Sequence, residues 1–287
     1  MTAPLLLCTD LDRTLVPNGS QPESPGARAL FARLVARAHV TLAYVSGRNR
    51  GQIEGAIDDY DLPRPDFAIS DVGSTIYDLR SGGWHPWSGW HERIAPDWGG
   101  SDRAALSEVL ADLEALRPQE PGKQSTFKLS YYVSLEVDRQ ALDALVGERL
   151  RARGVSASRV WSVDESAAVG LLDVVPVGAT KLHAVEFLRA ELGVALEHVL
   201  FAGDSGNDLQ VLASPIPSVL VANAAADVVR DASTQSSEGG HRKALYLATG
   251  GLFGMNGNYA AGILEGLAHF RPDLLPVLEE SFRDLSP

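Results

Sequence analysis

The stretch LLLCTDLDRTL, residues 5–15, ends a short apolar run with two aspartates that stand two positions apart. Residues 5–8 have the composition of a buried strand, and a buried carboxylate is costly unless something compensates its charge. Because alternate residues of a strand point the same way, Asp10 and Asp12 would lie side by side at the strand's carboxyl end. Such a pair favours a shared proton or a bound cation.

Strand-like apolar runs alternate with helical patterns towards both ends of the chain. The N-terminal elements are expected at residues 5–10 (strand), 24–38 (helix), 40–47 (strand), 53–57 (helix) and 66–74 (strand). The C-terminal elements are expected at residues 181–193 (helix), 198–204 and 218–223 (strands, each followed by a short helix), 243–249 (strand) and 258–270 (final helix). This alternation predicts the α/β class, with a doubly wound, mostly parallel sheet and helices on both faces.

The middle of the chain differs from both ends. Four of the five tryptophans stand among glycines and prolines in residues 81–100, which indicates a linker, a change of domain and tryptophans packed at the junction. Further elements are expected beyond it, at residues 126–137 (strand with one solvated face), 139–153 (helix), 158–166 and 169–176 (strands). We therefore predict an α/β cap domain over residues 81–173, inserted into a core that comprises residues 1–80 and 174–287.

The 287 residues carry a formal net charge of −12 and a single cysteine, Cys8. An acidic protein lacks the basic patch that binding to nucleic acid or to an anionic membrane usually needs. One cysteine cannot form an intramolecular disulfide, and no apolar stretch approaches the roughly 18 residues that span a bilayer. We therefore expect a cytoplasmic protein with neither a nucleic-acid nor a membrane partner.

Polar motifs follow four of the expected strands: DLDRT, VSGR, SDVGS and GDSGND. Sites in doubly wound sheets form outside the carboxyl ends of the strands, and the first and last motifs supply Asp10, Asp12, Asp204 and Asp208 there. Such an oxygen-rich cluster suits Mg²⁺. An aspartate beside a phosphoryl group can attack it to form an aspartyl-phosphate. A second carboxylate two residues on can protonate the leaving oxygen and then deprotonate the hydrolytic water.

The remaining motifs supply candidate phosphate-binding groups. Ser46, with the backbone N–H groups of Gly47 and Arg48, could hold a phosphoryl oxygen at a helix start, although Ser46 could also simply cap that helix. Lys181, just inside the helix that follows PVGAT, is the candidate for offsetting negative charge in the transition state. Asn207, within GDSGND, is also expected at the site.

The ordered motifs DLDRTL, VSGR, Lys181 and GDSGND resemble the four motifs of the haloacid dehalogenase (HAD) superfamily, phosphatase branch. The insertion resembles the large α/β cap of its Cof-type subgroup, and FKLSYYV, GLLDVVP and YAAGILEGLAHF are similar to stretches of the sucrose-phosphate phosphatases. The resemblance implies a HAD-like Rossmannoid core, with Asp10 as nucleophile, Asp12 as acid/base, and Ser46 and Lys181 as phosphate ligands.

The resemblance also implies a set of metal ligands. Mg²⁺ would be held by the Asp10 carboxylate, the Asp12 backbone carbonyl and Asp204. Asn207 and Asp208 would orient metal-bound water or Lys181. Cap closure over the site would exclude bulk water and read the sugar.

The substrate expectation depends on a departure from the family pattern. Sucrose phosphatases usually have a Gln-Arg-type pair just before the motif lysine, where this chain has Val177 and Gly178. Sucrose 6-phosphate or a related disaccharide phosphate is the leading expectation. The alternatives are kanosamine or another amino-sugar phosphate, and glucosyl- or mannosylglycerate phosphate. Arg48, Lys128 and Asp173 are the other candidate substrate contacts.

Two further functions share this core. A phosphosugar mutase would return the phosphoryl group to the sugar, and a non-catalytic sensor would only bind a sugar phosphate. The presence of both Asp10 and Asp12 favours an enzyme over a sensor. The sequence does not identify a partner sugar-phosphate synthase, and it gives no role to the glycine-rich residues 249–258.

Overall fold

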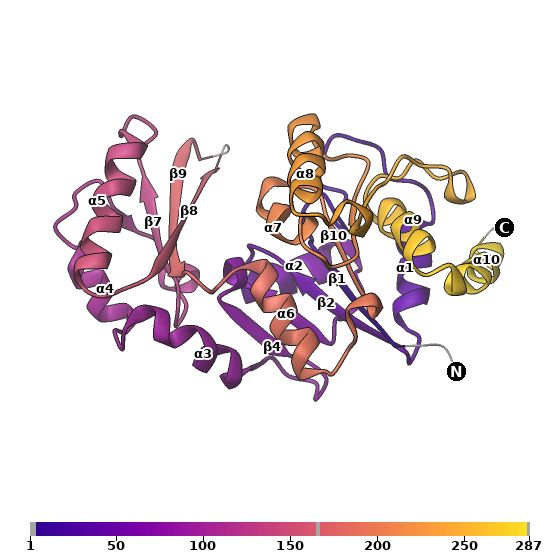
Figure 1. Cartoon of the computed structure of the whole chain (residues 1–287), viewed down its shortest axis with the longest axis horizontal. Helices are drawn as coiled ribbons and strands as arrows, with labels where there is room; N and C mark the ends of the chain where they lie inside the picture. Colours follow the sequence, from indigo (N-terminus) through magenta and orange to yellow (C-terminus); the bar gives the residue numbers. More distant parts are fainter. Residues whose placement is uncertain (1–3, 165–166, 286–287) are drawn as a thin grey trace.

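A computed structural model describes residues 4–164 and 167–285. Within these ranges the chain forms two bodies, each built around one β-sheet (Figure 1). The larger body has an eight-stranded sheet with the order β12-β11-β10-β1-β2-β3-β4-β5. The smaller has a four-stranded sheet with the order β6-β7-β9-β8. The last two residues of the strand expected at 158–166 lie outside the described residues.

Six strands of the large sheet run parallel: β1 (Leu5–Thr9), β2 (Val40–Val45), β3 (Phe67–Ser70), β10 (Val199–Gly203), β11 (Ser218–Leu220) and β12 (Leu245–Leu247). The predicted α/β fold with a mostly parallel sheet is thus confirmed. Two short strands that the sequence did not suggest, β4 (Thr75–Asp78) and β5 (His85–Pro86), extend one edge in the antiparallel direction.

Helices cover both faces of the large sheet. One face carries α1 (Ala27–Val35), α2 (Arg50–Tyr60), α9 (Ala260–Phe270) and α10 (Leu275–Arg283). The other face carries α3 (Ser88–Ile94), α6 (Lys181–Glu191), α7 (Leu209–Leu212) and α8 (Ala226–Glu238). Short 3₁₀ turns connect the elements, at Asp71–Gly73, Ala95–Trp98, Pro121–Lys123, Leu196–His198, Gly206–Asp208, Arg242–Ala244, Leu252–Gly254 and Pro272–Leu274.

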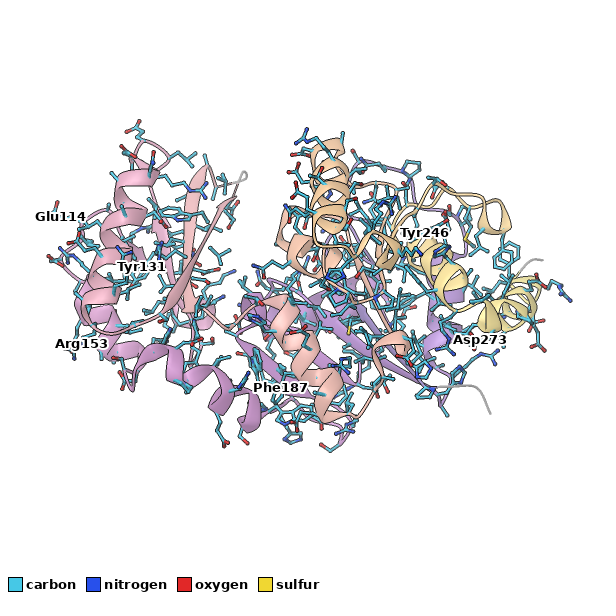
Figure 2. The ribbon with its side chains drawn as sticks, in the orientation of Figure 1. Glu114, Tyr131, Arg153, Phe187, Tyr246 and Asp273 are labelled. Atoms are coloured by element: carbon cyan, nitrogen blue, oxygen red, sulfur yellow. The ribbon has the colours of Figure 1, made fainter. Side chains whose placement is uncertain are left out.

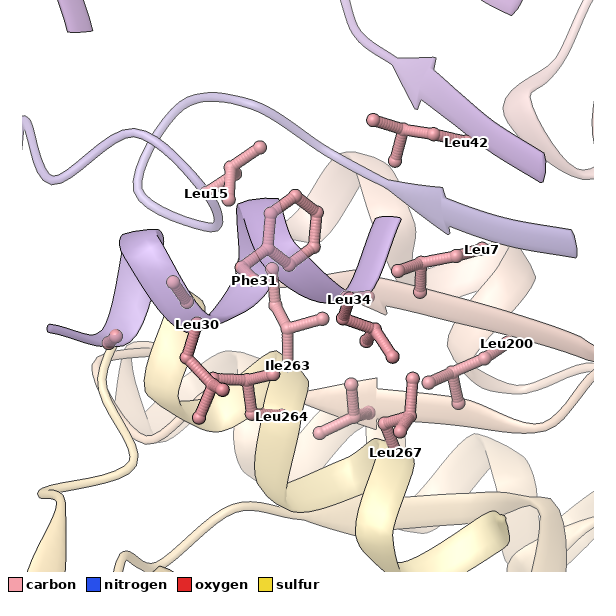
Figure 3. Packing of buried hydrophobic residues seen from close by; sticks show 14 of the residues in the cluster. Leu7, Leu15, Leu30, Phe31, Leu34, Leu42, Leu200, Ile263, Leu264 and Leu267 are labelled. Atoms are coloured by element: carbon pink, nitrogen blue, oxygen red, sulfur yellow. The ribbon is translucent and has the colours of Figure 1, made fainter. Parts of the chain in front are cut away.

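The central strand β1 explains why both faces are covered. Leu5 and Leu7 pack into the cluster under α1 and α9, whereas Leu6 and Cys8 pack into the cluster under α6 and α7. Because alternate side chains of a strand point to opposite faces, an uninterrupted apolar run must be buried from both sides. Figure 3 shows Leu7 with the facing side chains of α1 and α9.

Three helix expectations need correction. The helix expected at residues 258–270 is not the last, because α10 follows it and places Leu278 in the core. Pro276 falls in the first turn of α10, where proline is tolerated. In the sequence alone, a proline at this position indicates the end of a helix. The helix after β11 was expected to be short, yet α8 has 13 residues, with a mostly polar sequence. Residues 88–94 form α3, where a linker was expected.

The smaller body contains α4 (Arg103–Leu110) and α5 (Arg139–Ala152) with the strands β6 (Arg117–Pro118), β7 (Leu129–Val133), β8 (Ala157–Asp164) and β9 (Val169–Pro176). The two helices lie on the side of the small sheet away from the core (Figure 1). Tyr131 of β7 is buried in this body (Figure 2), whereas its neighbour Ser130 points to the opposite face and pairs with Asp173 of β9. Ser130 and Asp173 therefore lie on the sheet face that is turned towards the core, together with the apolar Val160.

The hydrophobic clusters indicate where one body ends and the other begins. Ile94 packs with the core and Trp98 with the small body; on the return crossing, Val174 packs with the small body and Val175 with the core. We infer that the cap spans about residues 98–174, because Trp84, Trp87, Trp90 and Ile94 pack with the core. Phe187 of α6 (Figure 2) lies against the rings of Trp87 and Trp90, at 5.8 and 5.2 Å between centroids.

Candidate active site

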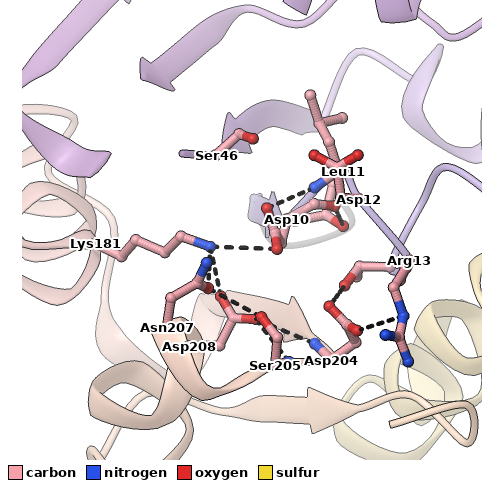
Figure 4. Close-up of polar contacts among 12 residues, drawn as sticks. Asp10, Leu11, Asp12, Arg13, Ser46, Lys181, Asp204, Ser205, Asn207 and Asp208 are labelled. Atoms are coloured by element: carbon pink, nitrogen blue, oxygen red, sulfur yellow. Dashed lines mark hydrogen bonds and ion pairs between the residues drawn. The ribbon is translucent and has the colours of Figure 1, made fainter. Parts of the chain in front are cut away.

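Three buried aspartates gather at the carboxyl ends of two neighbouring strands (Figure 4). Asp10 follows β1 and Asp204 follows β10, and these two strands pair in parallel. Asp208 lies one short turn beyond Asp204. The three side chains offer carboxylate oxygens that all lie within 4.8 Å of one another. Parallel pairing thus brings together groups that are far apart in the sequence.

Lys181 contacts this group from the first turn of α6, whose N-cap is Thr180. Its Nζ lies 2.7 Å from Asp208 Oδ1, 2.8 Å from Asn207 Oδ1 and 3.3 Å from Asp10 Oδ2. Burial works to lower the pKa of Lys181, but the carboxylates of Asp10 and Asp208 outweigh it, and the net pKa lies above the usual value. The buried side chain is therefore held as an ammonium.

Three ionised carboxylates would carry more negative charge than Lys181 alone can offset. Burial raises the pKa of Asp10 to about 8; Lys181 opposes this, while Asp208 and Asp204 add to it. Burial, with the nearby Asp208 carboxylate, also raises the pKa of Asp204 to about 6. Three carboxylates at this spacing form an all-oxygen donor set, which fits a hard divalent cation such as Mg²⁺.

The oxygens of the three aspartates differ in how firmly they are held. Asp204 accepts from Thr14 Oγ1 at 3.3 Å and contacts Arg13 Nε at 3.4 Å, both longer than a strong charge-assisted hydrogen bond. Asp208 pairs with Lys181 at 2.7 Å through one oxygen, and its other oxygen accepts from the N–H groups of Asp204 and Ser205 at 3.1 and 3.2 Å. The carboxylates of Asp10 and Asp204 are thus freer to accept a further ligand than that of Asp208.

The Asp12 carboxylate faces Arg48 and not the acidic group. Arg48 donates to it from Nε at 2.8 Å and from Nη2 at 2.6 Å, and Asn18 Nδ2 donates at 2.7 Å. Burial works to raise the pKa of Asp12, but these donors and the Arg48 charge hold it below its usual range. Asp12 is therefore held as a carboxylate at the rim of the site.

Ser46 follows β2, the other neighbour of β1, and its buried side chain lies at the same sheet edge (Figure 4). Its Oγ accepts the backbone N–H of Arg48 at 3.2 Å. The interpretation of Ser46 as a helix cap is wrong, because Asn49 caps α2 and forms a capping box with Gln52. A Cβ added at Gly47 would meet nothing within 4 Å, so this backbone is open to a ligand.

The candidate substrate residues of the cap lie across from this edge. Lys128 Nζ is 3.0 Å from Asp71 Oδ1 of the core, and both side chains are nearly buried. Ser130 Oγ donates to Asp173. Lys128 is thus paired with Asp71, and Asp173 with Ser130.

Val177 and Gly178 belong to the second crossing between cap and core. The Val177 side chain is exposed, and the Gly178 N–H donates to Asp97 Oδ2 of the first crossing at 2.7 Å. The two crossings are therefore tied to each other at this point.

Three residues at the site escaped the sequence interpretation: Arg13, Asn18 and Asn223. Arg13 contacts Asp204, Asn18 donates to Asp12, and Asn223 donates to the Arg13 carbonyl. Arg13 lies within the DLDRT motif and Asn18 lies close to it, which was their only signal in the sequence. Asn223 lies near none of the four motifs.

Comparisons with known proteins agree with this geometry. The sequence profile of the sucrose-6F-phosphate phosphohydrolase family matches residues 3–271. A putative HAD-like hydrolase of Nitrosococcus oceani is 51% identical over 95% of this chain and 73% of its own length. The mannosylfructose-phosphate phosphatase of Agrobacterium fabrum is 26% identical over 92% of this chain and 96% of its own.

A solved structure extends the match to three dimensions. The sucrose-phosphatase of Synechocystis, solved with sucrose and phosphate, superposes with a TM-score of 0.71 at 26% identity, covering 94% of this chain and 98% of that one. None of the described helices is long and apolar enough to cross a membrane. The chain is a HAD-like phosphatase and belongs to the sucrose-6F-phosphate phosphohydrolase family.

Proposed function

We propose that the protein is a Mg²⁺-dependent phosphatase that hydrolyses a sugar phosphomonoester through an aspartyl-phosphate on Asp10. The observation that carries the proposal is the buried Asp10 carboxylate, which lies 3.3 Å from Lys181 Nζ and beside Asp204 and Asp208. A carboxylate can attack phosphorus only where the charge of both anions is offset. Lys181 supplies one such positive charge.

Asp10 is favoured over Asp12 as the nucleophile by its surroundings. The Leu11 N–H donates to Asp10 Oδ1 at 2.8 Å, which fixes the carboxylate and leaves Oδ2 towards Lys181. In the proposed reaction an Asp10 oxygen forms a bond to phosphorus as the bond from phosphorus to the sugar oxygen breaks. Water then attacks the same phosphorus, and the Asp10 carboxylate leaves as inorganic phosphate forms.

We assign the metal-binding role chiefly to Asp10 and Asp204, with the Asp12 backbone carbonyl as the family resemblance implies. Mg²⁺ bound there would offset the charge of the attacking carboxylate and of the phosphate. Asp208 is better suited to orienting Lys181, because its short 2.7 Å contact and its two backbone donors use both of its oxygens.

Asp12 is assigned the proton transfers. It would give a proton to the leaving sugar oxygen and later take one from the attacking water. Arg48 holds Asp12 as a carboxylate, which is the form needed for the second transfer, and the proton that Asp12 takes from the water there is the one it would give to the leaving oxygen of the next substrate. Ser46, the Gly47 backbone, Lys181 and Asn207 are proposed to bind the phosphoryl oxygens.

The proposed substrate class is supported by the family and by polar side chains on the cap face that is turned towards the core. A sugar presents many hydroxyl groups, and Ser130 and Asp173 lie on the sheet face that is turned towards the core. Sucrose 6-phosphate or a related disaccharide phosphate is the leading candidate, in line with the names of the similar phosphatases. Val177 and Gly178 supply no polar side chain, so another sugar phosphate is the second candidate.

The experiment is phosphate release from a panel of sugar phosphates, with Mg²⁺ or with EDTA. The panel includes sucrose 6-phosphate, glucose 6-phosphate, kanosamine 6-phosphate and glucosylglycerate phosphate. Turnover that requires Mg²⁺ and prefers a disaccharide phosphate is expected. Phosphoryl transfer to a second sugar position without release would favour a mutase. A properly folded protein that binds a sugar phosphate but turns over none would favour a sensor.

A further inference from the structure

The glycine-rich residues 249–258 and the residue after them, Tyr259, are held firmly against the core. Glu265 of α9 is buried and accepts the N–H groups of Thr249 at 3.0 Å and Gly250 at 2.8 Å. Near the other end, the Gly257 carbonyl accepts the N–H of Ala222 at 3.0 Å. The segment 249–259 is thus fixed at both ends, and it sets the position of the Tyr259 backbone.

Asn223 connects this segment to the catalytic loop. It lies just beyond β11 and is 3% exposed. Its Oδ1 accepts the Tyr259 N–H at 2.8 Å, and its Nδ2 donates to the Arg13 carbonyl at 2.6 Å. The orientation of the amide follows from these partners, because an N–H can only donate and a carbonyl can only accept.

Arg13 needs such a contact because of its backbone conformation. Its φ is +57°, in the left-handed region that residues other than glycine rarely occupy and keep only where the surroundings hold them. The Arg13 N–H donates to Asn18 Oδ1 at 2.9 Å, so both polar groups of its backbone are held by asparagines. Arg13 separates Asp12 from Thr14, so its conformation sets the direction of both.

We propose that Asn223 is a positioning residue of the phosphatase site, with the segment 249–259 as its support. By holding the Arg13 carbonyl, Asn223 fixes the turn that places Asp12 on one side and Thr14 on the other, where the Thr14 hydroxyl donates to Asp204. The inference rests on the proposed phosphatase function. It gives the glycine-rich segment a role in catalysis at a distance from the substrate.

The test compares two variants in which a side-chain amide that donates to a backbone carbonyl becomes a carboxylate. Asn223→Asp keeps the side-chain shape and the acceptor for Tyr259, but an oxygen replaces the donor that faces the Arg13 carbonyl. Gln119→Glu is the matched control, because Gln119 Nε2 in the cap donates to the carbonyl of Tyr131 at 3.0 Å, away from Arg13 and outside the segment 249–259. Turnover of p-nitrophenyl phosphate with Mg²⁺ is measured for both, together with thermal unfolding.

For Asn223→Asp we expect kcat to fall about tenfold or more while KM stays within about threefold, as for a misplaced catalytic group. For Gln119→Glu both parameters should stay within about twofold. Should Asn223→Asp fail to fold, Asn223→Ser removes the same donor without burying a charge, and the same loss of kcat is expected. A folded Asn223 variant with unchanged kcat would overturn the inference.

A second readout separates positioning from general stabilisation. Glycine adopts a positive φ without strain, so the Arg13→Gly background should reduce the fold-loss that Asn223→Asp causes. An equal loss in both backgrounds would contradict the proposed role. Wild-type protein that turns over neither p-nitrophenyl phosphate nor any sugar phosphate of the panel would contradict the proposed function, and this inference with it. An active wild type with an unaffected Asn223→Asp would overturn this inference alone.

Discussion

The molecule buries two lysines against aspartates, one inside the core and one between the core and the cap. Lys181 contacts three side-chain oxygens, from Asp10, Asn207 and Asp208. Lys128 of the cap pairs with one core carboxylate, Asp71. Buried charges need partners in both places, but only the first set lies within one body. The core lysine belongs to a permanent site, whereas the cap lysine has its partner only while cap and core are together.

The Asp71 turn connects the two regions. Asp71, Val72 and Gly73 all have positive φ values. A Cβ at Gly73 would lie 2.7 Å from the carbonyl carbon of Thr180, the N-cap residue of α6. A second contact, from Asn49 Nδ2 to the Gly122 carbonyl at 3.0 Å, also joins core and cap. The turn that pairs with the cap lysine therefore also packs against the helix that carries Lys181.

The largest effect is expected from Lys181→Met. Removing the ammonium should lower kcat by about a hundredfold or more, because the attacking carboxylate and the phosphate would lose a fixed positive charge. Steady-state phosphate release at saturating Mg²⁺ measures the change. Lys128→Met is the comparison variant, and a kcat loss as large as that of Lys181→Met would contradict the distinction between the two lysines.

Lys128→Met should mainly lower the stability of the fold. An unpaired Asp71 carboxylate would remain buried, and breaking a buried pair in this way costs about 3–5 kcal/mol of the free energy of unfolding. The double variant Lys128→Met/Asp71→Asn should recover most of that loss. Urea unfolding of the wild type, both single variants and the double variant gives the coupling. If the stability losses of the two single variants simply added in the double variant, Lys128 and Asp71 would not stabilise the fold through their contact with each other.

The same pair predicts a dependence on pH. Burial raises the pKa of Asp71 above its usual value, while Lys128 opposes the rise. A raised carboxyl pKa in the folded state means that stability is lost as pH rises through it. Without Lys128 the pKa of Asp71 rises further. The difference in the free energy of unfolding between wild type and Lys128→Met should therefore grow from about pH 4 to about pH 7. Thermal unfolding across this range should show no such widening for the double variant.

Gly73→Ala should have a smaller effect, which isolates the contact between the Asp71 turn and α6. Its control is Gly82→Ala, because both glycines have a φ of +94° but a Cβ at Gly82 would meet nothing within 4 Å. Both variants carry the backbone strain, and only Gly73→Ala must displace Thr180. We expect Gly73→Ala to cost about 1–3 kcal/mol more and also to lower kcat. If Gly73→Ala and Gly82→Ala lost the same stability and the same activity, the contact between this turn and the helix that carries Lys181 would have no measurable effect.

The sequence predicts the buried parts of the core well for a physical reason. β1 must be buried on both faces, and this leaves few alternatives for its neighbours or for the edge where Asp10 lies. The motif residues Asp10, Lys181 and Asp208 were therefore expected together, and they lie together. Their catalytic and binding roles remain predictions.

Other features left no comparable signal. β4 and β5 are too short to show a period, and α8 has only two large apolar side chains, Val228 and Val229, both near its start, so its full length left little signal. Asn223 and Arg13 are 210 positions apart in the sequence and meet through hydrogen bonds from Asn223 Nδ2 to the Arg13 carbonyl and from Arg13 Nη2 to the Asn223 carbonyl. Pairing of this kind depends on tertiary structure, which no local pattern encodes.

The central claim is that Asp10 carries the phosphoryl group. Its most direct test is acid quenching of the enzyme during turnover of its best substrate with Mg²⁺, followed by mass spectrometry of the peptide that contains Asp10. We predict one added phosphoryl group on Asp10, which disappears together with turnover in a folded Asp10→Asn variant. Sustained phosphate release by Asp10→Asn, or a phosphoryl group on another residue, would contradict the account.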